Sequence, residues 1–274
     1  TWIFRTAKKN DRIDARKMAV LYRMGELPTV YMPDAQVRQW RQMIKHRRDL
    51  LNKQTQVKNQ IRALVKSQGI CRPISEGSWW KRVNRAWLKS LSEAIQSSLS
   101  PLWRMELGGF LEQLSLLEGQ IDRITSYLDA YLATQPQAEL VLSIPGIGPR
   151  TAEAILAYTD DIKRFGNGKQ YGSYFGLTPK LDESGSYRRV GHITKQGPSL
   201  VRWLLVECSW MVVRKSPSLQ AFYRRVCGGQ KERKKIAIVA VARKLTEIIR
   251  AMLLTDRRFD DSLVSQVVSK DQVA

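Results

Sequence analysis

Apolar residues recur at helical spacing along several stretches of the chain, with polar residues between them. A short stretch of this kind covers residues 11–23. A longer one covers residues 34–67, where Gly25 and Pro33 precede it and Asp34 is placed to cap it. The pattern predicts a short helix followed by a helix of about nine turns. The apolar stripe of the longer helix is formed by Val37, Trp40, Ile44, Leu51, Ile61 and Val65.

A second long stretch, residues 107–131, alternates apolar spacings of three and four and so forms a heptad seam. Gly108 and Gly109 each weaken a helix by about 1 kcal/mol relative to alanine, so we expect the regular seam to begin near Phe110. A seam of this kind needs a partner helix, and residues 32–136 are predicted to form a helical coiled-coil arm. The seam residues are Leu107, Phe110, Leu114, Leu117, Ile121, Ile124, Leu128 and Tyr131.

The two long helices differ in charge, because the first is basic and the second carries most of the acidic residues of the arm. Opposite signs favour their pairing, either as an antiparallel hairpin within one chain or between chains in a dimer. Periodicity leaves both arrangements open. The segment between them, which we expect to form short helices, contains Trp79, Trp80, Trp87 and Trp103.

After Pro136 the pattern changes to short elements typical of a compact domain, predicted for residues 137–259. Residues 260–274 are weakly patterned and are predicted to form a flexible tail. The fold class is therefore mainly α. The helices expected in the compact domain cover residues 149–158, 199–213, 218–226 and 231–254.

Charge narrows the function classes, because 46 Lys and Arg against 25 Asp and Glu give a formal net charge of +21. A field of this size favours a polyanion such as nucleic acid, although a well-solvated basic surface is the alternative. The apolar fraction of 43% is enough for a folded core, and no run is long enough to span a membrane.

Cysteine and histidine usage restricts the chemistry further. The three cysteines, Cys71, Cys208 and Cys227, have no disulfide or zinc spacing, and so favour buried free thiols in a reducing cytosol. With His46 and His192 as the only histidines, any metal must be held by oxygen ligands.

Asp11 and Asp14 are a candidate metal site, since a spacing of three places both carboxylates on one face of a helix. The alternative is an ordinary helix start, with Asp11 as the N-cap and Asp14 near the positive helix end. The spacing alone favours the capping interpretation.

Residues 144–152, with the sequence Ile-Pro-Gly-Ile-Gly-Pro-Arg-Thr-Ala, resemble the hairpin of helix-hairpin-helix modules. There, glycines allow backbone N–H groups to approach a phosphate at a helix N-terminus. Gly146, Gly148 and Arg150 are thus candidate nucleic-acid contacts without base specificity. A simple tight turn is the alternative.

Ser184 is a candidate nucleophile because Arg188, Arg189 and Lys195 follow it closely, and guanidinium groups clamp phosphate oxygens and stabilise a transferring phosphoryl group. Small polar residues beside Gly185 are also common turn formers, so a structural turn is the alternative. A further basic set is expected to be the solvated face of a helix: Lys231, Arg233, Lys234, Lys235, Arg243 and Lys244.

Five segments together resemble the DEDD transposases of insertion sequences, whose relatives include pilin-gene invertases. The resemblance runs over almost the whole chain, and the set of motifs is more specific than any one of them. The segments are residues 9–16 (KNDRIDAR), 143–148 (SIPGIG), 175–179 (FGLTP), 183–186 (ESGS) and 191–197 (GHITKQG).

This resemblance implies a RuvC-like domain of ribonuclease H fold ending within residues 1–31, the helical arm, and a transposase domain with Ser184 as nucleophile. Four carboxylates of the family bind Mg²⁺, and the last two match Asp11 and Asp14. It also implies DNA target and donor sites, a structured bridge RNA as guide, assembly into dimers or tetramers through the arm, and a prokaryotic cytosolic or nucleoid location.

The family's first Asp and its Glu have no counterpart here, so we expect a fragment that is inactive alone. Two other functions remain open from the sequence. One is a RuvC-like junction nuclease that hydrolyses DNA with metal-bound water, and the other is a non-catalytic module that binds nucleic acid and assembles.

Overall fold

A computed structural model shows a predominantly helical protein, as the sequence predicts. The chain divides into two compact units, Thr1–Ala35 and Gln36–Ala274. None of the described helices combines the length and the apolarity needed to cross a membrane. The described residues are 10–27, 30–71, 78–93, 102–184, 187–262 and 264, with the backbone alone described for 181–184 and 187–190.

The first unit contains α1 (Asp11–Arg23), which has the predicted bounds. Its N-cap is Asn10, whose extended backbone lets the side-chain oxygen accept a hydrogen bond from the Arg12 N–H at 3.0 Å. The interpretation of Asp11 as the N-cap is therefore wrong. Asp11 and Asp14 both lie in the first turn, where the helix dipole favours negative charge.

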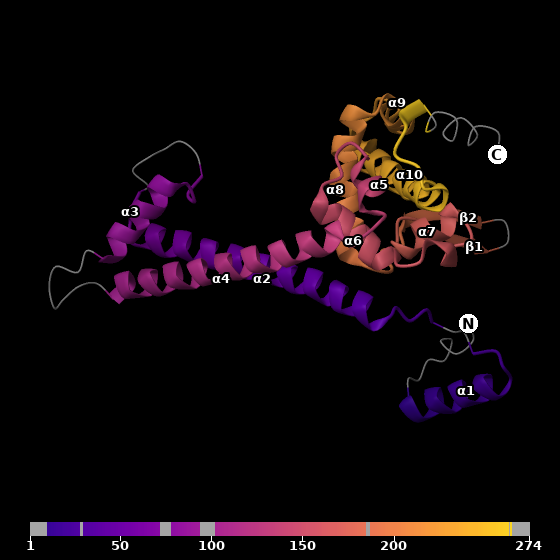
Figure 1. Cartoon of the computed structure of the whole chain (residues 1–274), viewed down its shortest axis with the longest axis horizontal. Helices are drawn as coiled ribbons and strands as arrows, with labels where there is room; N and C mark the ends of the chain where they lie inside the picture. Colours follow the sequence, from indigo (N-terminus) through magenta and orange to yellow (C-terminus); the bar gives the residue numbers. More distant parts are fainter. Residues whose placement is uncertain are drawn as a thin grey trace. The chain divides into compact units, whose positions relative to one another are not determined.

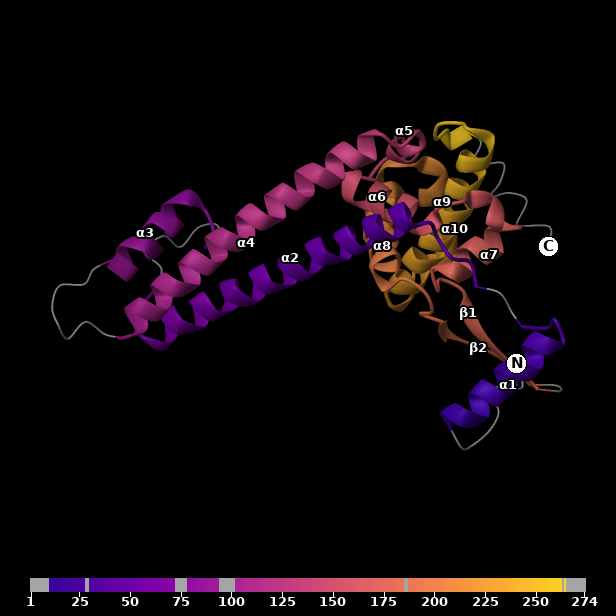
Figure 2. The same cartoon turned by 60° about the horizontal axis from the view of Figure 1, so that its bottom comes forward.

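The second unit begins with two long helices, α2 (Ala35–Ser67) and α4 (Leu102–Ala133), which run antiparallel along one another in Figure 2. They pair within one chain around a shared apolar core that also includes Leu88 of α3 (Arg82–Glu93). This core contains Leu50, Val57, Ile61, Val65, Leu107, Leu114, Leu117 and Ile121. The apolar stripe predicted for α2 included Leu51, but Leu51 is only half-buried and its neighbour Leu50 is the buried residue.

The expectation that regular structure in α4 begins near Phe110 is wrong, because the helix passes through Gly108 and Gly109 without a break. Leu107 is completely buried in the shared core, and α3 packs against this end of α4. Tertiary packing thus offsets the low helix propensity of the two glycines.

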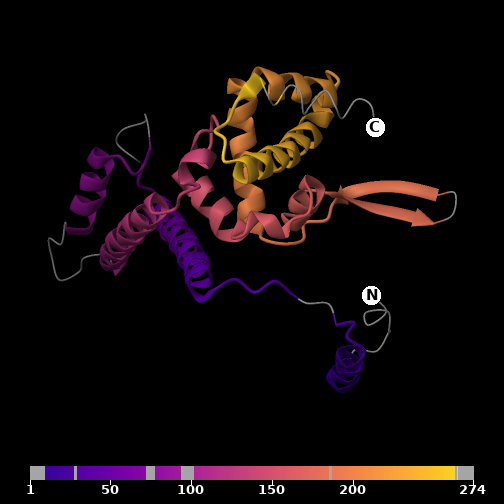
Figure 3. The ribbon, with the colours of Figure 1, turned by 45° about the vertical axis from the view of Figure 1, so that its right-hand side comes forward.

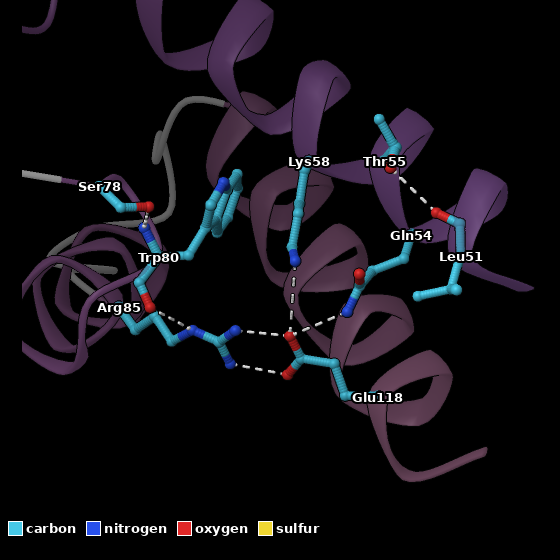
Figure 4. A network of polar contacts seen from close by, with 8 residues as sticks. All are labelled: Leu51, Gln54, Thr55, Lys58, Ser78, Trp80, Arg85 and Glu118. Carbon is cyan, nitrogen blue, oxygen red and sulfur yellow. Dashed lines mark hydrogen bonds and ion pairs between the residues drawn. The ribbon is translucent and has the colours of Figure 1, made fainter. Parts of the chain in front are cut away.

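Glu118 of α4 joins the three helices of the arm through a polar network (Figure 4). The guanidinium of Arg85 on α3 donates to both carboxylate oxygens, at 2.7 and 2.5 Å. From α2, Gln54 donates at 3.3 Å and the Lys58 ammonium lies 4.0 Å away. The hydrogen bonds from Arg85 hold the pKa of Glu118 below its ordinary value, although burial opposes this shift.

Replacing Glu118 by glutamine is expected to lower the free energy of unfolding at neutral pH by about 1–2 kcal/mol, since Arg85 and Lys58 lose their counter-ion. A carboxyl whose pKa is depressed by folding stabilises above its unfolded pKa and loses this contribution as the pH falls through the folded pKa. The difference between wild type and variant should therefore shrink in acid. Denaturant titrations at pH 7 and below pH 4 measure it, with the exposed Glu112→Gln as a control expected to change little.

The rest of the second unit is a helical domain whose core gathers residues from nearly all of its elements. Trp40 and Ile44 of α2 and Leu128 and Leu132 of α4 join this core, so the base of the arm packs directly on the domain. The elements, drawn in Figure 1, are α5 (Ala138–Leu142), α6 (Pro149–Thr159), α7 (Gly168–Tyr174), β1 (Pro179–Ser184), β2 (Tyr187–Ile193), α8 (Ser199–Lys215), α9 (Pro217–Cys227) and α10 (Lys234–Thr255), with short 3₁₀ turns at Ile162–Arg164 and Lys231–Arg233.

The four helices predicted for this domain match α6, α8, α9 and α10 within a few residues, but α5, α7 and the hairpin of β1 and β2 were not predicted. The antiparallel strands extend away from the helices of the domain (Figure 3). Their sequence is rich in charged residues and glycine, and so lacks the alternating apolar pattern of a half-buried strand.

The segment predicted as a flexible tail begins with residues that pack on the domain. Asp261 accepts hydrogen bonds from the Ser216 and Ser218 hydroxyls, where α8 ends and α9 begins. Val264 is buried in the main core. The packed domain therefore extends at least to Val264.

Candidate functional site

Ser184 is the last residue of β1, and its backbone pairs with Tyr187 at the start of β2. In the same register Arg188 pairs with Glu183, and Arg189 pairs with Asp182. The fold thus brings the predicted nucleophile and the two predicted phosphate-binding arginines together in one hairpin. Their side chains, and Gly185 and Ser186, lie outside the described part of the structure.

Two glycines fix the base of this hairpin against the helical domain. Gly176 and Gly197 both have positive φ angles, of 69° and 73°. A Cβ at Gly176 would clash with the Gln196 backbone, and one at Gly197 would clash with the Tyr174 carbonyl oxygen. Only glycine satisfies both the backbone angle and the close approach at these positions.

Arg202 of α8 reinforces the same junction, because it donates to the carbonyl oxygens of Phe175 at 3.1 Å and Gln196 at 2.9 Å. The predicted residue Lys195 lies here, exposed and with a φ of 55°, and its N–H donates to the Gly176 carbonyl at 3.2 Å. Sequence reasoning missed Arg202, because an arginine within a helix carries no signal of carbonyl binding.

The predicted Pro-Gly-x-Gly hairpin connects α5 to α6. Gly146 has a φ of 98°, and a Cβ there would lie 2.7 Å from the Met211 Cβ, so packing on α8 explains this glycine. Gly148 is the exposed N-cap of α6, and a Cβ there would meet open space. Its backbone is extended, Pro149 after it has no N–H, and the N–H groups of Thr151 and Ala152 both donate to the Gly148 carbonyl at 3.0 Å.

Arg150, the third predicted contact of this hairpin, is engaged in ion pairs with Asp129 of α4 and Glu153 of α6. Burial lowers the pKa of its guanidinium, an effect that Glu153 opposes and Arg47 adds to. Glu153 is completely buried and also pairs with Arg47 of α2. This charge cluster joins the arm to the domain, and sequence reasoning missed Glu153 and Arg47.

Asp11 and Asp14 lie three residues apart in the first turn of α1, a spacing that allows both carboxylates to face one cation. Within the described residues there is no group of three or more His, Cys, Asp or Glu side chains that could hold a metal ion. Within the described residues, these two carboxylates alone do not make up such a group.

Two of the three cysteines are buried. Cys208 is buried, and this burial raises its pKa to about 12, so the thiol stays protonated at neutral pH. Cys227 is also buried, and Cys71 is exposed. The expectation of buried free thiols is thus confirmed for two of the three.

The sequence predicts that the basic residues around α10 form a solvated face. The structure agrees for most of them but not for all. Lys231, Lys234 and Lys235 are exposed, in agreement with that expectation. Lys244, however, is buried and its ammonium lies 3.0 Å from the Glu247 carboxylate. An ion pair at a spacing of three along α10 makes its burial tolerable.

Two segments of the chain match known protein families. Residues 138–224 match the model described as "Transposase IS116/IS110/IS902 family", and residues 3–69 match a DEDD transposase model of the IS110 group, described as "Transposase". Over these two segments the chain is similar to transposases of the IS116/IS110/IS902 family. The matched segments include α1 with its two aspartates and the hairpin that carries Ser184.

Individual relatives agree with this family. A "Probable family 20 transposase" of Pseudomonas aeruginosa is 26% identical over 85% of this chain and 69% of its own length. The transposase for insertion sequence element IS1111A of Coxiella burnetii is 27% identical over 90% of this chain and 67% of its own length. A pilin gene-inverting protein of Moraxella lacunata is 33% identical over 45% of this chain and 39% of its length. The chain thus spans about two thirds of the two transposases.

Proposed function

We propose that this transposase-family chain cuts and rejoins DNA at insertion-sequence ends through the hydroxyl of Ser184. The observation that carries the proposal is the anchored hairpin, which holds Ser184, Arg188 and Arg189 within one short two-stranded ladder. A nucleophile must be held in a defined position to attack a phosphodiester, and the glycine and Arg202 contacts at the hairpin base serve that need.

In the proposed reaction the Ser184 oxygen attacks the phosphorus and loses its proton, and the bond to the 3′ oxygen breaks. The products are a phosphoserine ester and a DNA strand whose 3′ oxygen has taken up a proton. Arg188 and Arg189 neutralise the charge on the phosphoryl oxygens. Because one ester replaces another, a 3′ hydroxyl from the same or another strand can attack in reverse and restore a phosphodiester.

Asp11 and Asp14 are proposed as two of the ligands of Mg²⁺, with two further carboxylates in the intact protein, and residues 1–31 as the end of a RuvC-like domain. The ion would supply charge stabilisation at the reacting oxygens. The proposed partners are target and donor DNA, a structured guide RNA, and further copies of the chain bound through the arm. The large positive charge supports polyanionic partners.

The test is to incubate full-length protein with DNA carrying an element end and Mg²⁺, and then to denature the mixture. We expect a covalent protein–DNA adduct that maps to Ser184 and is absent from the Ser184→Ala variant. Ser173→Ala, which changes a serine of α7 in the same domain, is the control and should retain the adduct.

Clean hydrolysis that is unaffected by Ser184→Ala would overturn the serine mechanism in favour of a junction nuclease. Salt-sensitive binding of DNA or RNA without any cleavage would instead indicate the non-catalytic module.

A further inference from the structure

Helix α8 also has large apolar side chains that are partly exposed on the side away from the core, where the Trp210 ring lies edge-on to Tyr223 of α9 at 6.1 Å between centroids. The buried stripe of α8 consists of Val201, Leu205, Cys208 and Val212, which face the main core. On the other side Trp203 is 44% exposed, Trp210 36% and Met211 41%. We call Trp203, Trp210 and Met211 the aromatic face of α8.

The two tryptophans project from the same side of the helix, because a spacing of seven residues is close to two full turns. Their positions on the helix are about 10 Å apart along its axis. Partly exposed aromatic side chains gathered on one side of a helix mark a candidate interaction surface.

Cationic groups accompany this face. The Arg48 guanidinium of α2 lies over the Trp203 ring, 4.4 Å from its centroid. Arg214, one turn after Trp210, is exposed and approaches the Met211 sulfur at 4.0 Å. The acidic group here is Glu207, so phosphates would be held at the two ends of the face rather than at its middle.

The aromatic face also adjoins the Pro-Gly-x-Gly hairpin, because Gly146 lies directly against Met211. Met211 thus lies where α8 packs on this hairpin. Cationic side chains that contact phosphates and indole rings that stack on bases are the two components of a single-strand binding surface.

We propose that the aromatic face of α8 binds unpaired bases of single-stranded DNA, with Trp203 and Trp210 stacking on the bases and Arg48 and Arg214 contacting phosphates. Bases within a duplex are already stacked on their neighbours, so only unpaired ones can occupy the indole rings. The choice of DNA rests on the proposed function, because strand exchange leaves bases near a cut end temporarily unpaired.

The test measures the affinity of the full-length protein for a labelled oligothymidylate of about 15 nucleotides by fluorescence anisotropy. We expect Trp203→Ala and Trp210→Ala each to weaken binding about tenfold, while Trp203→Phe retains most of the affinity. Because stacking releases no counterions, the alanine variants should leave the slope of affinity against salt unchanged. Tyr127→Ala, which removes an exposed ring on α4, is the matched control and should bind as wild type.

Arg48→Ala and Lys53→Ala remove the same charge from α2, yet only Arg48 lies over the indole ring. We expect the Arg48 change to weaken binding several-fold more than the Lys53 change. Equal effects, or wild-type affinity in both tryptophan variants, would overturn the proposal. So would equal losses on a duplex of the same length, or tighter binding of an oligouridylate than of the oligothymidylate.

If Trp203→Ala and Trp210→Ala convert a dimer to a monomer in sedimentation without changing oligonucleotide affinity, the face is an interface between copies and the proposal fails. Ser184→Ala is expected to bind the oligonucleotide normally. If no covalent adduct formed at Ser184, the oligonucleotide result would still stand. If the tryptophan variants bound normally, the adduct result would still stand.

Discussion

Replacing Glu153 by alanine is expected to lower the free energy of unfolding by about 3–5 kcal/mol, because it leaves the buried Arg47 guanidinium without a counter-charge. Glu153 is fully buried and Arg47 is 7% exposed, so water cannot replace the lost interaction. Arg47 is already imperfectly satisfied, since its Nη1 has no hydrogen-bond partner among the described residues. Equilibrium denaturation followed by circular dichroism measures the effect.

Two further variants distinguish the effect of breaking a buried ion pair from the effect of removing any charged side chain. Glu139→Ala breaks a highly exposed ion pair with Arg258 and should change stability by roughly 0.5 kcal/mol or less. The double variant Arg47→Met with Glu153→Met should recover most of the loss, because it removes both buried charges together. If Glu153→Ala destabilised no more than Glu139→Ala, the cluster would not hold the arm to the domain.

Replacing Gly197 by alanine is expected to cost about 2–4 kcal/mol of folding free energy and to abolish adduct formation. The new Cβ adds strain at a positive φ and overlaps the Tyr174 carbonyl oxygen, so the loop at the hairpin base must move. Because the same loop positions β2, the serine hairpin loses its fixed attachment.

Gly229→Ala provides the matched control. Gly229 has nearly the same φ, 75°, but a Cβ there would meet nothing within 4 Å. This variant should cost about 1 kcal/mol from backbone strain alone and leave adduct formation unchanged. Equal behaviour of the two alanine variants would mean that the close approach at Gly197 has no role in holding the hairpin.

Helix periodicity was sufficient to locate most of the fold. The bounds of α1 and α2 follow from apolar spacing together with Gly25 and Pro33, which end one helix before the next begins. Helix propensity was less reliable than periodicity in α4, where Gly108 and Gly109 have low propensity but lie next to a buried leucine of the predicted seam. Local propensity amounts to about 1 kcal/mol per glycine, and burial of neighbouring side chains exceeds it.

The candidate site was predicted only in part. Ser184, Arg188 and Arg189 were found because they are close in sequence, but the hairpin that pairs them was not, since a projecting ladder needs no apolar alternation. Arg150 was predicted to bind nucleic acid, whereas in the fold Asp129 and Glu153 hold it. Glu153 is three residues from Arg150 on α6, so sequence spacing allows this pair, but Asp129 lies on α4 and its contact depends on the packed fold.

The sequence by itself determined the helical character of the protein, the long paired helices, the strong positive charge and the segments that resemble a transposase family. Each of these depends on residues close together in the chain or on composition. Only the tertiary structure decided that Glu153 is buried between Arg47 and Arg150, that Gly197 must be glycine, and that Trp203 lies beneath Arg48. Apart from the Arg150–Glu153 pair, whose residues are three apart on α6, these contacts join residues distant in sequence, and local patterns carry no information about which of them meet once the chain has packed.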